Sequence, residues 1–252
     1  MRILIEIKLF FKRRIIEELR QPVWIIAGLA TPLMYIALFS PLLRNMGGIP
    51  QTTPQVLDAF VPGILTLLAF NSGIGAAWDI VRELESGLVE RFRVTPASRF
   101  SMLMGMVSSN VIAFIVPALL VIIVSMFFGF TAHVGGLIVL LILLCGLTMM
   151  VSSWSTSIGL ILKQMGSVAA VMTSSQLPLT LLSGVLLPLS LGPKWLQVLA
   201  HINPMYYTVE ASHKLSIGII LAPEVYLAFA VIIVLNIIVL TWATNVYKKA
   251  VA

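Results

Sequence analysis

Charged residues are scarce in this sequence, and hydrophobic residues are abundant. Of the 252 residues, 10% are charged and 59% are hydrophobic, whereas soluble domains contain about 25% charged and about 45–50% apolar residues. The mean hydropathy of +1.04 shows the same imbalance. This composition argues against a water-soluble fold and predicts an integral membrane protein, with room for about six helices of roughly 20 residues each.

The sequence also has a single cysteine and no cluster of histidines. The one cysteine, Cys145, lies in an apolar run, so no disulfide can form within one chain, and we interpret it as a small packing residue. The histidines are far apart and no H-E-x-x-H motif occurs, which argues against an intramembrane zinc protease. We therefore predict no metal site, and we interpret His133, His201 and His213 as surface or interface residues.

Ionisable side chains are absent from the cores of the long apolar stretches. Proton- or ion-coupled transporters usually need such groups inside the membrane, and a serine protease would need a buried base beside its serine. Asp79 and Lys163 lie only at the ends of stretches. The sequence thus disfavours a secondary transporter, a channel and an intramembrane protease. The predicted spans are residues 23–43, 59–80, 101–130, 135–162, 166–190 and 225–246.

The length of these stretches predicts helices. A membrane β-strand would need only about 9–11 residues with alternating polarity, and this alternation is not found. The predicted fold class is therefore an all-α integral membrane protein, with six transmembrane helices in a single domain that covers residues 1–252.

The G-x-x-x-x-G-K-[ST] loop that cradles the phosphates of ATP is absent. We therefore expect that this chain is not an ATPase and binds no cofactor of its own. If it moves a substrate against a gradient, the energy must come from another polypeptide that docks onto it. Residues 1–22 and 81–99 are the cytoplasmic segments long enough to receive such a partner.

Lys and Arg residues are distributed unevenly between alternate loops, and this distribution predicts the orientation. With the N-terminus in the cytoplasm, 13 of the 16 Lys and Arg residues lie in cytoplasmic segments. Both termini and residues 81–99 are then cytoplasmic, in a multi-pass protein of the cell inner or plasma membrane. This topology explains the net charge of +6 without a nucleic-acid partner. The basic residues on the outer side are Arg44, Lys194 and Lys214.

The N-terminal segment mixes charged and apolar side chains. Residues 2–20 combine six basic residues with apolar residues such as Ile7 and Phe10. This pattern predicts an amphipathic helix over residues 1–22 that lies on the inner membrane surface, before Pro22 begins the first span. A plain positive-inside anchor would show the same charges.

Residues 81–99 hold seven of the 26 charges of the chain. On a helix that turns about 100° per residue, Glu83 and Glu90 lie opposite an apolar stripe, and Pro96 is predicted to end the helix. Acidic residues contribute little to membrane topology, so the acids here favour a surface that contacts a partner. A solvated loop is the alternative. The stripe consists of Val81, Leu84, Leu88 and Phe92.

Residues 191–215 are predicted to lie at the outer surface. Gly192-Pro193 and Asn203-Pro204 break helices, and the amphipathic stretch between them is too short to span a membrane. We predict re-entrant helices here, with surface helices anchored by aromatic residues as the alternative. The side chains that suit the interfacial belt are Trp195, Tyr206 and Tyr207.

Polar residues inside the predicted spans are candidates for a substrate path. Small polar groups also let helices pack closely and hydrogen-bond to each other, so packing is the alternative for each of them. Gln176 is among the better candidates, because a large amide is costly to leave unpaired in lipid. The candidate path residues are Asn71, Asn110, Thr173 and Gln176.

Two motifs resemble those of type-2 ABC exporter permeases. The first is E-x-E-x-G-x-x-E followed by T-P-x-S-R, within residues 81–99. The second covers residues 182–213, where a Pro-broken segment, an N-P pair, two aromatic residues and an acid precede the last span. The R-Q-P at residues 20–22 is also typical. The first motif consists of Glu83, Glu85, Gly87, Glu90, Thr95, Pro96, Ser98 and Arg99.

The resemblance implies a six-span half of an exporter, most similar to the drug and antibiotic exporters of bacteria. Two such permeases, identical or related, would pair above two ATP-binding cassette subunits, which would hold ATP and Mg²⁺. Residues 81–99 would form the coupling helix that contacts the ATPase subunit through the motif residues, and residues 191–215 would form re-entrant helices at the outer mouth. The implied outer-gate residues are Pro193, Trp195, Asn203, Pro204, Tyr206 and Tyr207.

Other functions share some of these features. A path without charges suits an amphipathic or lipid-like substrate, which is compatible with a drug, an antibiotic or an envelope glycan. Polysaccharide and teichoic-acid exporter permeases have the same architecture. A non-transporting membrane sensor or assembly protein would instead bind its partner through residues 81–99, and an ATPase partner would separate that class from the exporters.

Overall fold

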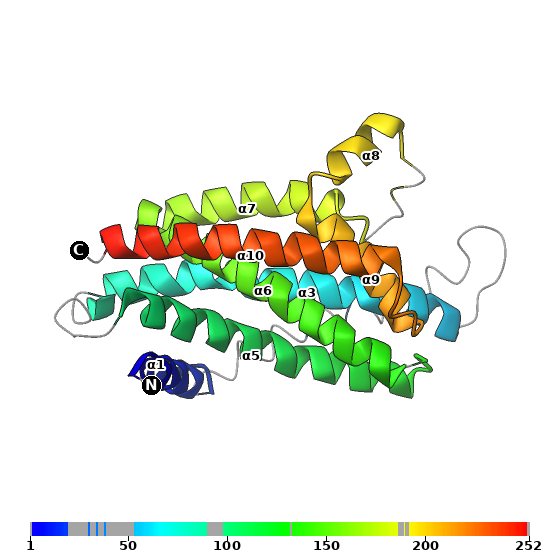
Figure 1. The fold of residues 1–252 in the computed structure, drawn as a ribbon, viewed down its shortest axis with the longest axis horizontal. Helices are drawn as coiled ribbons and strands as arrows, with labels where there is room; N and C mark the ends of the chain where they lie inside the picture. The colour runs from blue at the N-terminus through cyan, green and yellow to red at the C-terminus, as the bar shows by residue number, and fades with distance from the viewer. Residues whose placement is uncertain are drawn as a thin grey trace.

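The computed structural model describes residues 2–19, 53–89, 98–131, 133–185 and 192–250, and also residues 30, 34, 38 and 189. These residues form helices joined by turns, and no strand occurs among them. The predicted all-α class is confirmed for this part of the chain. The helices are α1 (Arg2–Leu19), α3 (Thr53–Glu85), α5 (Arg99–Phe127), α6 (Val134–Leu162), α7 (Met165–Leu181), α8 (Lys194–Ala200), α9 (Pro204–Ser216) and α10 (Pro223–Ala250) (Figure 1).

Four of the described helices are long and apolar enough to cross a membrane. They correspond to the predicted second, third, fourth and sixth spans. The predicted first span, residues 23–43, lies outside the described residues except for three isolated positions. The count of six spans therefore stays a prediction. The four candidate spans are Leu57–Glu85 within α3, Arg99–Phe127, Val134–Leu162 and Pro223–Ala250.

Two predicted spans differ in length from the helices observed. Within the predicted fifth span, residues 166–190, helix α7 ends at Leu181 and has 17 residues, and residues 186–188 and 190 lie outside the described part of the chain. The helix ends at Leu181 because the chain turns over residues 182–184. By contrast, α3 extends beyond the predicted span 59–80 at both ends and includes Glu83 and Glu85.

Helix α6 forms the centre of the bundle. It contacts α3, α5, α7, α9 and α10, and in Figure 1 it runs diagonally between α3, α5 and α10. Leu140, Leu143, Leu144 and Leu147 on α6 are fully buried in the main hydrophobic core. These five helices are therefore positioned by their packing against α6.

Small residues bring α3 and α6 close together. A Cβ atom added to Gly159 of α6 would lie 2.8 Å from the carbonyl oxygen of Ala77 on α3, which is too close for any side chain. Close backbone approach at small residues is typical of helices packed in membranes. We call this contact the α3–α6 seam; it also contains Ala69, Gly73, Thr148 and Ser155.

Hydroxyl groups of α6 also form hydrogen bonds across the α3–α6 seam. The Oγ of Ser155 donates a hydrogen bond to the carbonyl oxygen of Gly73 at 2.6 Å, and the Oγ1 of Thr148 donates to that of Ala69 at 3.1 Å. Interhelical hydrogen bonds of this kind contribute about 0.6 kcal/mol each in membrane proteins. The serine-rich stretch of α6 is therefore used in packing between helices.

Helix α1 lies at the end of the bundle where α3 and α10 also end. Figure 1 shows it in blue beside α5 and crosswise to the long helices. It packs against α5, where Phe10 lies against Gly105. The predicted N-terminal helix is thus present, and its crosswise direction distinguishes it from the spans.

Candidate functional site

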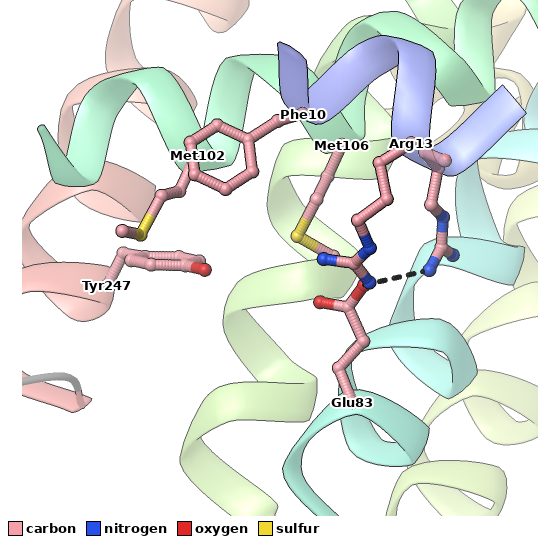
Figure 2. Close-up of a pocket in the computed structure, with 7 residues that line it drawn as sticks. Phe10, Arg13, Glu83, Met102, Met106 and Tyr247 are labelled. Carbon is pink, nitrogen blue, oxygen red and sulfur yellow. Dashed lines mark hydrogen bonds and ion pairs between the residues drawn. The ribbon is translucent and has the colours of Figure 1, made fainter. Parts of the chain in front are cut away.

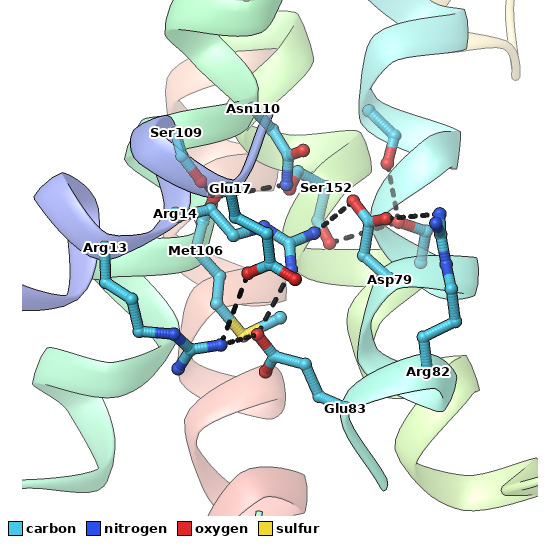
Figure 3. A network of polar contacts seen from close by, with 12 residues as sticks. Arg13, Arg14, Glu17, Asp79, Arg82, Glu83, Met106, Ser109, Asn110 and Ser152 are labelled. Atoms are coloured by element: carbon cyan, nitrogen blue, oxygen red, sulfur yellow. Dashed lines mark hydrogen bonds and ion pairs between the residues drawn. The ribbon is translucent and has the colours of Figure 1, made fainter. Parts of the chain in front are cut away.

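Ion pairs join α1 to the last turns of α3. The guanidinium groups of Arg13 and Arg14 both donate hydrogen bonds to Oε1 of Glu83, at 2.9 and 3.1 Å. Arg14 also pairs with Asp79, whose other carboxylate oxygen lies 2.7 Å from Nη2 of Arg82. Figure 3 shows these side chains converging from the two helices. One network of charges therefore ties α1 to α3.

The central pair of this network is buried. Glu83 and Arg14 are each 6% exposed, so the carboxylate of Glu83 is shielded from solvent. Removing one partner of a buried ion pair costs about 3–5 kcal/mol, because the other charge is left without compensation. The position of α1 on the bundle therefore depends on Glu83.

A second contact joins α1 to the start of α5. The backbone N–H of Ser98 donates a hydrogen bond to Oε2 of Glu6 on α1 at 3.0 Å. Ser98 is also the N-cap of α5, and its Oγ accepts from the backbone N–H of Ser101 at 3.0 Å. Glu83 precedes residues 90–97 and Ser98 follows them, so α1 contacts both ends of the predicted coupling segment. We call this set of contacts the α1 junction; its residues are Glu6, Arg13, Arg14, Asp79, Glu83 and Ser98.

The prediction of one continuous helix from Val81 onward is wrong. Val81–Glu85 are the last turns of α3, and the chain turns at Ser86 and Gly87. Gly87 has a φ of 68°, a left-handed conformation that glycine adopts without strain, and a Cβ atom added there would meet nothing within 4 Å. This glycine is therefore required for the turn and not for a close approach.

The two described acids of this segment lie on different faces of the last turn of α3. Glu83 faces α1 and is buried, whereas Glu85 is exposed to solvent. Arg99, the last residue of the motif, is half-buried at the start of α5. The remaining motif residues lie outside the described part of the chain: Glu90, Thr95 and Pro96.

A small cavity lies beside the ion pairs. Its volume of about 10 Å³ is room for about one water molecule. Tyr247 of α10 points its hydroxyl toward this space, and Glu83 approaches it from α3 (Figure 2). Four helices meet here, so the C-terminal end of α10 also contacts the α1 junction. The lining residues are Phe10, Arg13, Arg14, Glu83, Met102, Met106 and Tyr247.

The four candidate path residues divide into two places. Asn71 of α3 and Gln176 of α7 come together, and Nε2 of Gln176 donates a hydrogen bond to Oδ1 of Asn71 at 2.9 Å on an exposed face. Thr173, one turn before Gln176, is also exposed. Asn110 instead lies in the interior, where its Nδ2 donates to Oγ of Ser152 at 2.9 Å. Asn110 therefore takes part in packing between α5 and α6, and its place on a substrate path stays a prediction.

Helix α7 is poorly covered by the rest of the chain. Of its residues, only Val168 and Met172 are buried, although α3 and α6 contact it. Apolar side chains on its open side, such as Leu177 and Leu181, are exposed. The open face of α7 thus carries an apolar surface together with the Asn71–Gln176 pair.

The segment of residues 191–215 forms two short helices separated at Asn203-Pro204. Asn203 caps α9: its Oδ1 accepts from the backbone N–H of Met205 at 3.0 Å, and its Nδ2 donates to the carbonyl oxygen of Leu179 at 2.6 Å. Pro204 occupies the first turn of α9, where a missing N–H costs nothing. The segment is therefore anchored to the end of α7.

Aromatic side chains cluster beside this break. The rings of Tyr206 and Tyr207 meet edge to face with centroids 5.4 Å apart, and the hydroxyl of Tyr207 donates to the carbonyl oxygen of His201 at 2.8 Å. Partial burial raises the pKa of Tyr206, and burial lowers the pKa of His213 on the same helix. Pro193 and Trp195 lie apart from this cluster, exposed at the start of α8, which projects from the bundle in Figure 1.

Sequence reasoning missed the partners of Glu83. The sequence places Arg13 and Arg14 in an N-terminal helix on the membrane surface, and it indicates no role for Glu6 and Tyr247. Glu83 is 70 positions from Arg13 and 69 positions from Arg14, so no local pattern joins them. The only signal in the sequence is that both segments predicted to be cytoplasmic contain opposite charges.

Metal ligands do not cluster in the part of the chain that the structure describes. No group of three or more His, Cys, Asp or Glu side chains there could hold a metal ion. The α1 junction contains carboxylates, but guanidinium groups already accompany them. Its chemistry is therefore that of a structural joint between helices.

Known proteins resemble this chain over most of its length. It is 28% identical over 212 residues to a transport permease, ycf38, of Cyanophora paradoxa. The aligned residues cover 81% of this chain and 72% of that protein. The chain is 22% identical over 199 residues to the daunorubicin resistance ABC transporter permease protein DrrB1 of Streptomyces coeruleorubidus, covering 78% of this chain and 70% of that protein.

A third relative is the doxorubicin resistance ABC transporter permease protein DrrC of Mycobacterium tuberculosis. It is 24% identical over 201 residues, which cover 79% of this chain and 72% of that protein. The family model described as ABC-2 type transporter matches residues 5–216, which include most of α1, the α1 junction and α9. The resemblance inferred from the two motifs is confirmed, and the chain belongs to the ABC-2 type transporter family as a membrane permease subunit.

Proposed function

We propose that this permease is the membrane subunit of an ATP-driven exporter that moves an amphipathic or lipid-like molecule out of the cell. ABC-2 permeases work with ATP-binding cassette partners, and the two Drr relatives are named for resistance to amphipathic drugs. A separate subunit would hydrolyse ATP, because the sequence contains no phosphate-binding loop. A drug or an antibiotic is therefore the preferred substrate class, ahead of an envelope glycan.

The α1 junction is the observation that carries this proposal. Residues 81–99 are attached to the bundle at both ends, through Glu83 on α3 and Ser98 at the start of α5. A movement imposed on this segment by an ATPase subunit would therefore pass directly into two candidate spans. A solvated loop that served only to set topology would need no such attachment.

The motif residues take two different roles in this proposal. Glu83 is an internal anchor that holds α1, since its carboxylate is buried between Arg13 and Arg14. Glu85 is exposed beyond it and faces a partner. Contact with the ATP-binding subunit would then involve Glu85, Gly87, Glu90, Thr95, Pro96 and Arg99.

A second permease would cover the open face of α7. The pair of Asn71 and Gln176 is exposed there beside Thr173, and polar groups that face lipid are costly. A second copy, or a related permease, placed against this face would enclose a path lined by neutral polar groups. Two ATP-binding subunits would then lie beneath the two permeases.

The test is reconstitution with a candidate ATP-binding subunit. The purified permease alone is expected not to hydrolyse ATP, whereas the complex should show hydrolysis that amphipathic drugs stimulate. A mass measurement of the complex should show two permeases. ATP turnover by the permease alone, or an active complex with one permease, would contradict the proposal.

Substitution of the exposed acids tests the docking surface. The Glu85→Ala/Glu90→Ala double variant should weaken association with the ATP-binding subunit, because truncating one side of a charged contact costs about 2–5 kcal/mol. Glu210→Ala is the matched control, since Glu210 is an exposed acid on α9 at the other end of the bundle. Equal association of all three proteins would place the ATPase contact elsewhere.

A further inference from the structure

Helix α1 has an outer face that no described part of the chain covers. Its inner face packs against α5 through Phe10 and against α3 through the α1 junction. On the opposite side, Ile5, Leu9 and Ile16 are 59%, 63% and 41% exposed. With about 100° per residue, these three side chains form one narrow apolar stripe along the helix.

Two lysines border this stripe on one side. Lys8 and Lys12 are one turn apart and both are exposed. Neither makes an ion pair or a hydrogen bond within the described residues, whereas the neighbouring Arg13 and Arg14 are engaged with the acids of α3. The two basic groups of α1 thus differ: the arginines face the protein and the lysines face away from it.

We propose that the outer face of α1 binds anionic membrane lipid, with Lys8 and Lys12 on headgroup phosphates and the apolar stripe among the acyl chains. The helix lies crosswise to the candidate spans (Figure 1), so it runs parallel to a membrane surface. A plane of phosphates then meets both lysines at once. An apolar centre with a basic border is the pattern of helices that bind anionic interfaces.

This lipid contact has a consequence for the α1 junction. The same helix that meets the lipid holds Glu83 with Arg14 and Ser98 with Glu6. Anionic lipid therefore positions both ends of residues 81–99, and it favours the docked arrangement of α1. The consequence for ATP-driven coupling rests on the proposed function, but the binding itself does not.

The test uses the full purified chain and two lipids of different charge. Lipid-free protein in neutral detergent is titrated with phosphatidylglycerol or phosphatidylcholine, and the rise in the thermal unfolding midpoint gives the apparent affinity. The wild type should prefer phosphatidylglycerol, and added salt should weaken that preference. Lys8→Gln/Lys12→Gln should lower the affinity for phosphatidylglycerol about 30-fold.

Two further variants make the outcome specific to α1. Lys8→Arg/Lys12→Arg keeps the charge and should bind as the wild type does. Lys248→Gln/Lys249→Gln removes the same charge from exposed positions at the same end of the bundle and should change the affinity much less. Equal phosphatidylglycerol binding by the wild type and Lys8→Gln/Lys12→Gln, or equal loss in both glutamine variants, would overturn the proposal. Because no ATP-binding subunit is present, failure of the exporter proposal would leave this result unaffected.

Discussion

The α3–α6 seam and the α1 junction both gather polar groups inside an apolar protein, but with different chemistry. The seam uses neutral hydroxyls on α6 that donate to backbone carbonyl oxygens of α3, as Ser155 does to Gly73. The α1 junction uses charged side chains, with Arg13 and Arg14 on one carboxylate of Glu83. The seam runs along the middle of the bundle, and the junction lies at its end.

This difference shows which contact depends on a single group. Thr148 in the seam also hydrogen-bonds to Leu144 of its own helix at 2.9 Å, so it stays satisfied if α3 moves away. Glu83 has no such substitute, because its partners all come from α1. The seam is therefore held mainly by shape, and the α1 junction by specific charges.

The largest effect is expected from Glu83→Ala. The substitution removes the shared acceptor of Arg13 and Arg14, which keep ion pairs with Glu17 and Asp79. It should therefore destabilise the docking of α1 by about 3 kcal/mol, the lower end of the cost of breaking a buried ion pair. Hydrogen–deuterium exchange of the α1 amides in detergent should rise accordingly, while the amides of α6 should keep their protection.

Glu85→Ala provides the matched control for this comparison. Glu85 is two residues further along the same helix but exposed, so its removal should leave exchange in α1 unchanged. If α1 exchanges at the wild-type rate in Glu83→Ala, then charges do not hold the α1 junction and its contrast with the seam disappears.

Much of the fold was predictable because hydrophobicity and length determine it locally. The stretches 135–162 and 101–130 differ from α6 and α5 by only a few residues at their ends. Helix ends were less predictable. Polar and charged residues such as Arg82 and Glu83 suggested that the second span ended before them, whereas ion pairs with α1 allow α3 to continue to Glu85.

The candidate site was predictable only in part, for a similar reason. Local spacing singled out Glu83 and Gly87, but their roles depend on a partner helix about 70 residues away and on a left-handed turn. The apolar stripe predicted from Val81 to Phe92 requires one continuous helix, and the turn at Gly87 breaks it. Neutral polar residues were harder still, since Asn110 and Asn71 look alike in sequence but lie in the interior and on an exposed face.

A smaller effect is expected from Gly159→Ala, which tests whether close packing of the two backbones holds the α3–α6 seam. The new methyl group would lie 2.4 Å from Cγ2 of Ile80 and 2.8 Å from the carbonyl oxygen of Ala77, so the helices must separate. Overpacking of this kind costs about 1–3 kcal/mol, measured as a lower thermal unfolding midpoint.

Gly75→Ala is the control for the seam. A Cβ atom at Gly75 of α3 meets nothing within 4 Å, and alanine favours a helix by about 1 kcal/mol over glycine. That variant should be unchanged or more stable. A Gly159→Ala protein as stable as Gly75→Ala would show that backbone proximity does not hold α3 against α6.

The smallest effect is expected at the Asn71–Gln176 pair, which tests whether an exposed polar contact resembles the seam. A double-mutant cycle with Asn71→Leu and Gln176→Leu should give a coupling energy of about 0.6 kcal/mol in the permease alone, the usual value for a hydrogen bond between membrane helices.

In the assembled transporter the proposed second permease would cover this face, and the remaining amide would lose access to water or detergent. The coupling should then exceed its value in the lone permease, because an unpaired buried polar group costs about 1–3 kcal/mol. The cycle is measured by unfolding of the lone permease and again in the complex. Equal coupling in the two preparations would mean that the face stays open, and that the path does not run past Asn71 and Gln176.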